Sequence, residues 1–232
     1  MKIFGMQNFT LIDYPGKLAC ILFTGGCNFR CPYCHNPCLV LDPKSQKQIN
    51  HDKFFNFLES RVNKLDGVVI SGGEPTLDPN LEFFIKKIKS YNFLVKLDTN
   101  GSNPEIVKKL INSELIDAVG IDYKAPSKKY SKISKNSQIL GKNILKLIEF
   151  AIEKLGSKNV DIRTTIHKEL TTENDIHTMW QELSTHKTEK WHLQQYHETD
   201  VLDLNLSNKT WTNSELIEIA HNISPSISVR TN

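Results

Sequence analysis

The stretch LACILFTGGCNFRCPYCHNP, residues 18 to 37, joins an apolar run to three closely spaced cysteines. The run at 18–24 is apolar on both faces, as in a parallel strand that is buried between two layers. Cys27, Cys31 and Cys34 follow directly, with the spacing C-x3-C-x2-C. The sequence therefore predicts a buried strand with a thiol-rich loop at its carboxyl end.

This cysteine spacing favours an iron–sulfur cluster. Thiolates are soft ligands, and such clusters are held by close-set cysteines, usually four of them. Three thiolates can bind three irons of a [4Fe–4S] cluster and leave the fourth iron open to another ligand. A zinc site is the main alternative, with Cys38 or His35 as fourth ligand, but no second C-x2-C unit follows. A thioredoxin-like pair of Cys31 and Cys34 would have no use for Cys27.

Length and composition suit a single globular domain over residues 1–232, and the alternation of strands and helices described below makes it an α/β domain. The net charge of +3 is small, and no nucleic-acid-binding motif accompanies it. The start has no apolar core of a secretory signal, and no window reaches the about 18 apolar residues of a membrane span. Four of the five cysteines lie between Cys27 and Cys38, which fits metal binding in a reducing cytoplasm better than a disulfide framework. Cys20, inside the apolar run, is expected to be a small buried hydrophobe.

The rest of the chain alternates between strands and helices. An extended segment at 2–9 precedes the first strand, and a polar, lysine-rich loop or short exposed helix is expected at 127–137. Strands are expected at 18–24, 67–71, 93–98, 117–123, 160–166 and 191–196, with a final short strand at 227–230. Helices are expected at 51–65, 80–91, 104–112, 142–155, 172–183 and 213–221. Such a pattern forms either a doubly wound sheet or a barrel.

Polar residues and glycines lie where these strands end. In both folds, ligands bind at the carboxyl ends of the strands. Besides the cysteines, the residues placed there are Gly72, Gly73, Glu74, Asp98, Asn100, Asp122 and Lys124. Taken singly, each has an ordinary explanation, because turns are rich in Gly and Pro, Asn-Gly is a turn sequence and a lysine is usually a surface residue. Arg163 lies inside a strand and needs either a charged partner or a polar barrel interior.

The C-x3-C-x2-C motif followed by Gly72-Gly73-Glu74-Pro75 resembles the radical S-adenosylmethionine (AdoMet) superfamily. The resemblance implies a partial (β/α)6 TIM-like barrel of parallel strands. It also implies one [4Fe–4S] cluster whose open iron binds AdoMet. One electron from the cluster then cleaves AdoMet to a 5′-deoxyadenosyl radical that abstracts hydrogen.

Further motifs are similar to the activases of glycyl radical enzymes. They are CNFRCPYCHNP at 27–37, LDTNG at 97–101 and DYK at 122–124. The opening, residues 5–37, is most similar to activating proteins of anaerobic ribonucleoside-triphosphate reductases. The resemblance covers most of the chain through about Lys124 and is mainly architectural beyond it. Related activases carry extra clustered cysteines after the first motif, whereas only Cys38 follows here, so a single cluster is expected and Cys38 has no expected ligand role.

The resemblance also assigns site residues. Cys27, Cys31 and Cys34 would bind the cluster. Tyr33 would lie against the adenine of AdoMet, with His35 near the same pocket. Gly72, Gly73 and Glu74 would meet its methionine end. Asp98 and Asn100 would serve polar groups of the cofactor or a nearby cation, and Asp122 and Lys124 its ribose and carboxylate. Arg163 and Gln195 are looser matches.

The implied function is removal of hydrogen from a backbone glycine of a partner enzyme. The implied partner is an anaerobic ribonucleotide reductase, with flavodoxin or ferredoxin as electron donor, and without nucleic acid or membrane. The alternatives are an activase of the pyruvate formate-lyase type, or a small-molecule enzyme similar to 7-carboxy-7-deazaguanine synthase. From another class, the chain could be a zinc-stabilised binding module without catalysis.

Overall fold

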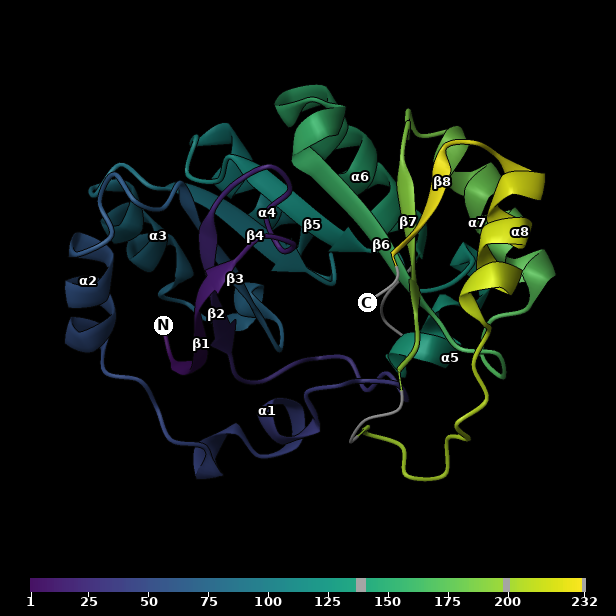
Figure 1. The fold of residues 1–232 in the computed structure, drawn as a ribbon, viewed down its shortest axis with the longest axis horizontal. Coiled ribbons are helices and arrows are strands. Elements are labelled where there is room, and N and C mark those ends of the chain that lie inside the picture. The colour runs from purple at the N-terminus through teal and green to yellow at the C-terminus, as the bar shows by residue number, and fades with distance from the viewer. Residues whose placement is uncertain (137–140, 198–200, 231–232) are drawn as a thin grey trace. The chain divides into compact units, whose positions relative to one another are not determined.

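The computed structural model describes residues 1–136, 141–197 and 201–230, and strands and helices alternate along it (Figure 1). In these residues the strands are β1 (Ile3–Thr10), β2 (Ala19–Thr24), β3 (Gly67–Gly72), β4 (Leu94–Thr99), β5 (Ala118–Asp122), β6 (Val160–Ile166), β7 (Trp191–Gln195) and β8 (Ile227–Arg230). The α-helices are α1 (Pro37–Leu41), α2 (His51–Glu59), α3 (Leu81–Lys89), α4 (Pro104–Asn112), α5 (Tyr130–Ser134), α6 (Gly141–Leu155), α7 (Glu173–Ser184) and α8 (Asn213–Ile223). Short 3-10 helices are η1 (Pro43–Ser45), η2 (Pro75–Leu77), η3 (Ser127–Lys129) and η4 (Ser157–Asn159).

The strands follow one another in the sheet in sequence order, from β1 to β8. The pairs β2–β3, β3–β4, β6–β7 and β7–β8 are parallel. A doubly wound sheet reverses its strand order at a switch point, whereas in a β/α barrel each strand pairs with the next one along the chain. Of the two folds that the sequence allows, the strand order is that of the barrel type.

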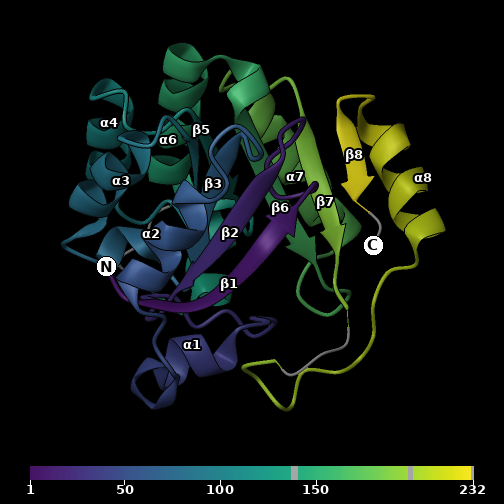
Figure 2. The same ribbon diagram turned by 60° about the vertical axis from the view of Figure 1, so that its left-hand side comes forward.

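The first strand runs against the others. β1 is antiparallel to β2, and Figure 2 shows the two as a hairpin. The connection between them is short and turns at Gly16, whose φ is +72°, with Lys17 N–H bonded to the Tyr14 carbonyl at 3.0 Å. Parallel strands need a crossover of a dozen or more residues, so this short connection permits only a hairpin. The sequence predicted the extended segment but not its direction.

The chain divides into two compact units. Unit 1 comprises residues 1–28, 36–99 and 105–120, and unit 2 comprises residues 29–35, 100–104 and 121–232. An apolar cluster in unit 1 consists of Tyr14, Ala19, Ile21, Val69 and Ala118. In unit 2, α8 packs beside β8 (Figure 1). That residues 1–232 form a single domain stays a prediction.

Two predicted segments differ from the structure. The helix expected at 51–65 ends at Glu59, because turns follow and Asn63 adopts a left-handed conformation with φ of 61°, which a helix cannot contain. The lysine-rich segment forms η3 and α5, but Tyr130 and Ile133 are buried, so its helix is not simply exposed; Ser137 lies outside the described residues. Within the described ranges, none of the helices combines the length and apolarity that a membrane crossing needs.

Candidate functional site

The predicted site residues lie at or after the carboxyl ends of strands, as expected. The cysteine loop with Tyr33 and His35 follows β2, and Gly72 is the last residue of β3. Asp98 is the penultimate residue of β4, and Asp122 and Gln195 end β5 and β7. This placement confirms the strand assignments, while the ligand roles of these residues stay predictions.

In unit 1 the Gly72–Glu74 backbone lies directly against the residues that lead to Cys27. The Gly73 N–H bonds the Thr24 carbonyl at 2.9 Å, and the Glu74 N–H bonds the Gly26 carbonyl at 2.8 Å. A Cβ on Gly73 would collide with that Gly26 carbonyl. Gly72 has a φ of +114°, and a Cβ there would meet the Thr24 backbone. Both glycines are thus needed for the close approach of two loops, a reason that the sequence reasoning did not include.

The carboxylate of Glu74 is buried and held by hydroxyl groups. Its side chain is 1% exposed. Oε1 accepts hydrogen bonds from the Thr76 N–H at 3.1 Å, from the Thr76 hydroxyl and from the Thr99 hydroxyl at 2.8 Å. These donors fix the orientation of the carboxylate. The contact with the methionine end of AdoMet that the resemblance assigns to Glu74 would therefore involve a side chain that is already oriented.

Asp98 has a partner that sequence reasoning missed. Nζ of Lys96 lies 2.6 Å from Oδ1 of Asp98, and both side chains are buried, 1% and 6% exposed. A buried carboxylate is stabilised by such a cation. The signal was present in the sequence, because residues two apart on a strand lie on the same face, and a lysine inside an apolar strand needs a counter-ion.

In unit 2, Tyr33 is enclosed by charged and aromatic groups. Its ring is buried, and burial raises the pKa of its hydroxyl well above the usual value. Lys124 acts to lower this pKa, whereas Cys31 and Asp122 raise it. Among the described residues, this hydroxyl has no hydrogen-bond partner. Leaving a buried hydroxyl unpaired costs about 1–3 kcal/mol. The Tyr33 hydroxyl is therefore suited to contact a bound group.

Asp122 and Lys124 form an ion pair next to this tyrosine. Lys124 Nζ donates to Asp122 Oδ2 at 3.1 Å, and Arg163 Nε donates to Oδ1 at 3.2 Å. Burial by itself would raise the pKa of Asp122, but the two cations outweigh it and hold the pKa below its usual value. Burial would lower the pKa of Lys124, but Asp122 and Cys31 outweigh it and raise that pKa. Both groups are thus held charged, and Arg163 has the charged partner that its position in a strand requires.

The other predicted residues of unit 2 have identifiable contacts. The His35 ring packs against Tyr196, with ring centroids 5.8 Å apart, and burial lowers the pKa of His35. Gln195 donates through Nε2 to the Trp211 carbonyl at 2.7 Å. Asn100 accepts the Ser102 N–H at 2.9 Å through its side-chain oxygen, which is the turn chemistry expected of Asn-Gly. The amide groups of Gln195 and Asn100 thus each hold a backbone group in place.

The cysteines are available as ligands. All five are thiols rather than disulfides. Cys20 is buried, as predicted, and burial raises its pKa to about 12, whereas Cys38 is exposed on α1. In the described part of the chain, no three Cys, His, Asp or Glu side chains are grouped as a metal site. The C-x3-C-x2-C spacing supplies three soft thiols of the kind that hold iron–sulfur clusters, so their assignment as ligands rests on the sequence and not on their grouping in the structure.

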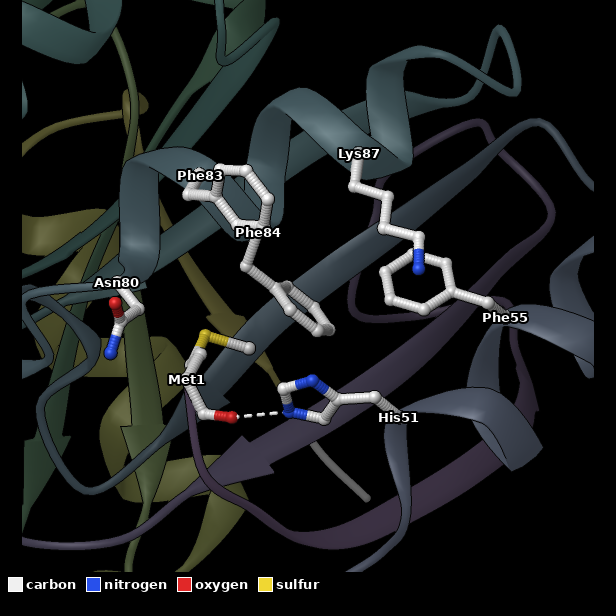
Figure 3. A pocket seen from close by; sticks show the side chains of 7 residues that line it. All are labelled: Met1, His51, Phe55, Asn80, Phe83, Phe84 and Lys87. Atoms are coloured by element: carbon white, nitrogen blue, oxygen red, sulfur yellow. Dashed lines mark hydrogen bonds between the residues drawn. The ribbon is translucent and has the colours of Figure 1, made fainter.

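A separate aromatic hollow of about 290 Å³ lies in unit 1 (Figure 3). Phe55 of α2 and Phe84 of α3 line it, and Nζ of Lys87 lies 4.0 Å from the centroid of the Phe55 ring. Nε2 of His51 is 2.6 Å from the Met1 carbonyl oxygen. None of the predicted site residues lines this hollow.

The sequence and fold both match known proteins. The family model of the Radical SAM superfamily matches residues 21–178. A candidate glycyl-radical enzyme activating enzyme of Methanocaldococcus jannaschii is 37% identical over 176 residues, 74% of this chain and 71% of that protein. The pyruvate formate-lyase-activating enzyme of Staphylococcus aureus is 35% identical over 101 residues, 41% of this chain and 40% of that enzyme.

A solved structure supports the fold assignment. A radical SAM methyltransferase from Sphaerobacter thermophilus has a TM-score of 0.70 at 12% identity, over 96% of this chain and 68% of that one. This likeness agrees with the strand order and with the partial TIM-like barrel that the resemblance implied. Members of the superfamily use a [4Fe–4S] cluster and AdoMet. The segment of this chain that matches the family model contains the three cysteines of the C-x3-C-x2-C motif. The chain belongs to the Radical SAM superfamily.

Proposed function

We propose that this chain is an activase that generates a glycyl radical on an anaerobic ribonucleoside-triphosphate reductase. The main support is the 37% identity to a candidate glycyl-radical enzyme activating enzyme over 74% of this chain. The similarity of residues 5–37 to activating proteins of these reductases supports the reductase as the partner. Superfamily membership argues against the zinc-stabilised module.

Different residues of the chain would bind the cluster and AdoMet. Cys27, Cys31 and Cys34 would hold the cluster, and Lys124, kept charged by Asp122, would bind the carboxylate of AdoMet. The buried hydroxyl of Tyr33, next to Lys124, has no hydrogen-bond partner among the described residues and would form its hydrogen bond with the cofactor. When bound, the cluster and AdoMet would supply the radical chemistry for removing a hydrogen atom from a glycine of the partner.

A second candidate is an activase of the pyruvate formate-lyase type. The observation in its favour is the 35% identity to the Staphylococcus aureus activating enzyme over 101 residues. The electron donor in both cases would be a flavodoxin or a ferredoxin. The two candidates share the chemistry and differ only in the protein that presents the glycine.

Electron paramagnetic resonance separates these proposals. The reconstituted protein is reduced chemically and incubated with AdoMet and, in parallel, with each glycyl radical enzyme of the same genome. We expect a glycyl-radical doublet with the reductase, and none when the acceptor glycine of the reductase is replaced by alanine. A doublet with only a pyruvate formate-lyase would favour the second candidate. No doublet with any of these enzymes would overturn the activase proposal and leave the superfamily assignment intact.

A further inference from the structure

Five side chains of alternating charge are joined in unit 2. They begin at Lys124 and continue through Asp122 of β5 and Arg163 of β6. NH1 of Arg163 also lies 3.9 Å from Oδ2 of Asp161, on the same face of β6. Arg230, the last residue of β8, then contacts Asp161 through both terminal nitrogens of its guanidinium group, NH1 and NH2. The series links the residue proposed to bind AdoMet to the end of the last strand.

Asp161 is the most deeply buried member of this series and accepts two hydrogen bonds from Arg230. Its side chain is 7% exposed. NH2 of Arg230 lies 2.7 Å from Oδ1, and NH1 lies 3.2 Å from Oδ2, a bidentate arrangement. Nε2 of His192 is 3.7 Å from Oδ1. A buried carboxylate that loses its main cation recruits another, because an uncompensated buried charge is costly.

Arg163 lies between two carboxylates. It is the side chain with a permanent positive charge that could replace Arg230 at Asp161, because His192, although 3.7 Å away, is charged only when protonated. Nε of Arg163 bonds Asp122 at 3.2 Å, while its NH1 stays 3.9 Å from Asp161, beyond hydrogen-bond distance. Asp122 and Asp161 therefore compete for one guanidinium.

We propose that Arg230 is a positioning residue for AdoMet binding, which acts by satisfying Asp161 so that Arg163 stays bonded to Asp122. The inference rests on the proposed function, in which Lys124 binds the carboxylate of AdoMet. Without Arg230, Arg163 moves toward Asp161 and Asp122 loses one of its two cations. Asp122 then binds Lys124 more strongly, and Lys124 binds the carboxylate of AdoMet more weakly.

A purely structural role is the alternative. The ion pair between Arg230 and Asp161 joins β8 to β6, with β7 between them in the sheet. Loss of this pair would then weaken AdoMet binding only by loosening β8. The two explanations differ for a double variant, because neutralising Asp161 removes the competitor for Arg163 but cannot restore the link between β8 and β6.

The test measures the dissociation constant for AdoMet on the reconstituted, cluster-loaded protein by isothermal titration calorimetry. Iron content and the thermal unfolding midpoint are recorded for each variant. Arg230→Met keeps most of the side-chain volume without the charge, and Arg230→Lys keeps the charge. Asp161→Asn combined with Arg230→Met removes both charges. Lys168→Met is the matched control, because its ion pair with Glu215 at 3.2 Å is also in unit 2 but exposed.

We expect Arg230→Met to weaken AdoMet binding by on the order of tenfold with normal iron content, and Arg230→Lys to weaken it less. The double variant should return to within about twofold of the wild type, and Lys168→Met should not differ from it. A double variant that binds as weakly as Arg230→Met would overturn the inference in favour of the structural role. Unchanged binding by Arg230→Met would also overturn it. A wild-type protein that does not bind AdoMet would overturn the proposed function itself.

Discussion

The hydroxyl of Thr99, the last residue of β4, donates a hydrogen bond of 2.8 Å to Oε1 of Glu74, which follows β3. Both residues are buried. The bond therefore connects the ends of two neighbouring parallel strands through a carboxylate that the resemblance assigns to the cofactor site. Hydrogen bonds to a charged group are stronger than those between neutral groups, so this contact holds the loop after β3 in one orientation.

Replacing Thr99 by valine should destabilise the protein. The substitution keeps the shape and removes the hydroxyl, so Glu74 loses one of its donors while it remains buried. We expect the free energy of unfolding to fall by about 1–3 kcal/mol, measured by urea denaturation. Thr178→Val is the control, because the Thr178 hydroxyl bonds the Asn174 carbonyl one turn back on α7, and not a buried carboxylate. Equal effects of the two substitutions would contradict the role given to Thr99.

Gly73→Ala should be more damaging than Gly16→Ala. A Cβ at Gly73 would collide with the Gly26 carbonyl, which is backbone and cannot rotate away. A Cβ at Gly16 has no atom within 4 Å, so only the positive φ of 72° opposes the substitution, at a cost of about 1 kcal/mol. Thermal unfolding of both variants measures the difference. A Gly73→Ala protein as stable as Gly16→Ala would show that the two loops are not in close contact.

Strand positions were the most predictable part of the fold. The strands predicted at 67–71, 160–166 and 227–230 agree with β3, β6 and β8 to within one residue, because these segments are rich in the β-branched residues that strands favour. The direction of β1 depends on the length of the turn around Gly16, which the apolar pattern does not reveal. The helix α1 was also missed, because its five residues are too few to show a periodicity.

The charged groups inside the strands show why the candidate site was only partly predictable. Asp122 and Lys124 were identified by their position at a strand end. Lys96 could have been paired with Asp98, two residues along the same strand. The pair of Arg230 and Asp161 could not, because the residues are 69 positions apart and meet only through the register of β6, β7 and β8.

Removing single thiols should separate cluster ligands from the other cysteines. Cys34→Ser should lower the iron content of the reconstituted protein well below that of the wild type, because a hydroxyl is a poor substitute for a soft thiolate. Cys38→Ser should leave iron content and the brown colour unchanged, since Cys38 is exposed on α1 and has no expected ligand role. Iron analysis and the visible absorption spectrum provide the measurement. Equal iron loss in both variants would make Cys38 a ligand and would contradict the assignment of the C-x3-C-x2-C motif.

The stability of the protein should fall as the pH drops below about 6.5, with His192 as one cause. Burial first, and then the positive charge of Arg230, hold the pKa of His192 below its ordinary value of 6.5, although Asp161 acts in the opposite direction. Below 6.5 the unfolded chain therefore binds a proton at this histidine that the folded chain does not bind. Since stability rises with pH wherever the unfolded state holds more protons, the contribution of neutral His192 is complete above 6.5 and decreases as the pH falls toward the folded-state pKa.

The variant His192→Gln tests this assignment. Glutamine can still bond the Ser228 hydroxyl, which lies 2.6 Å from Nδ1 of His192, but it does not titrate. Urea unfolding at several pH values between 5.5 and 8 should give a shallower loss of stability toward acid pH for the variant than for the wild type. The remaining slope would come from other groups such as His35, whose pKa burial also lowers. Parallel curves for the two proteins would show that His192 binds its proton equally well in the folded and unfolded chain, contrary to its partly buried position beside Arg230.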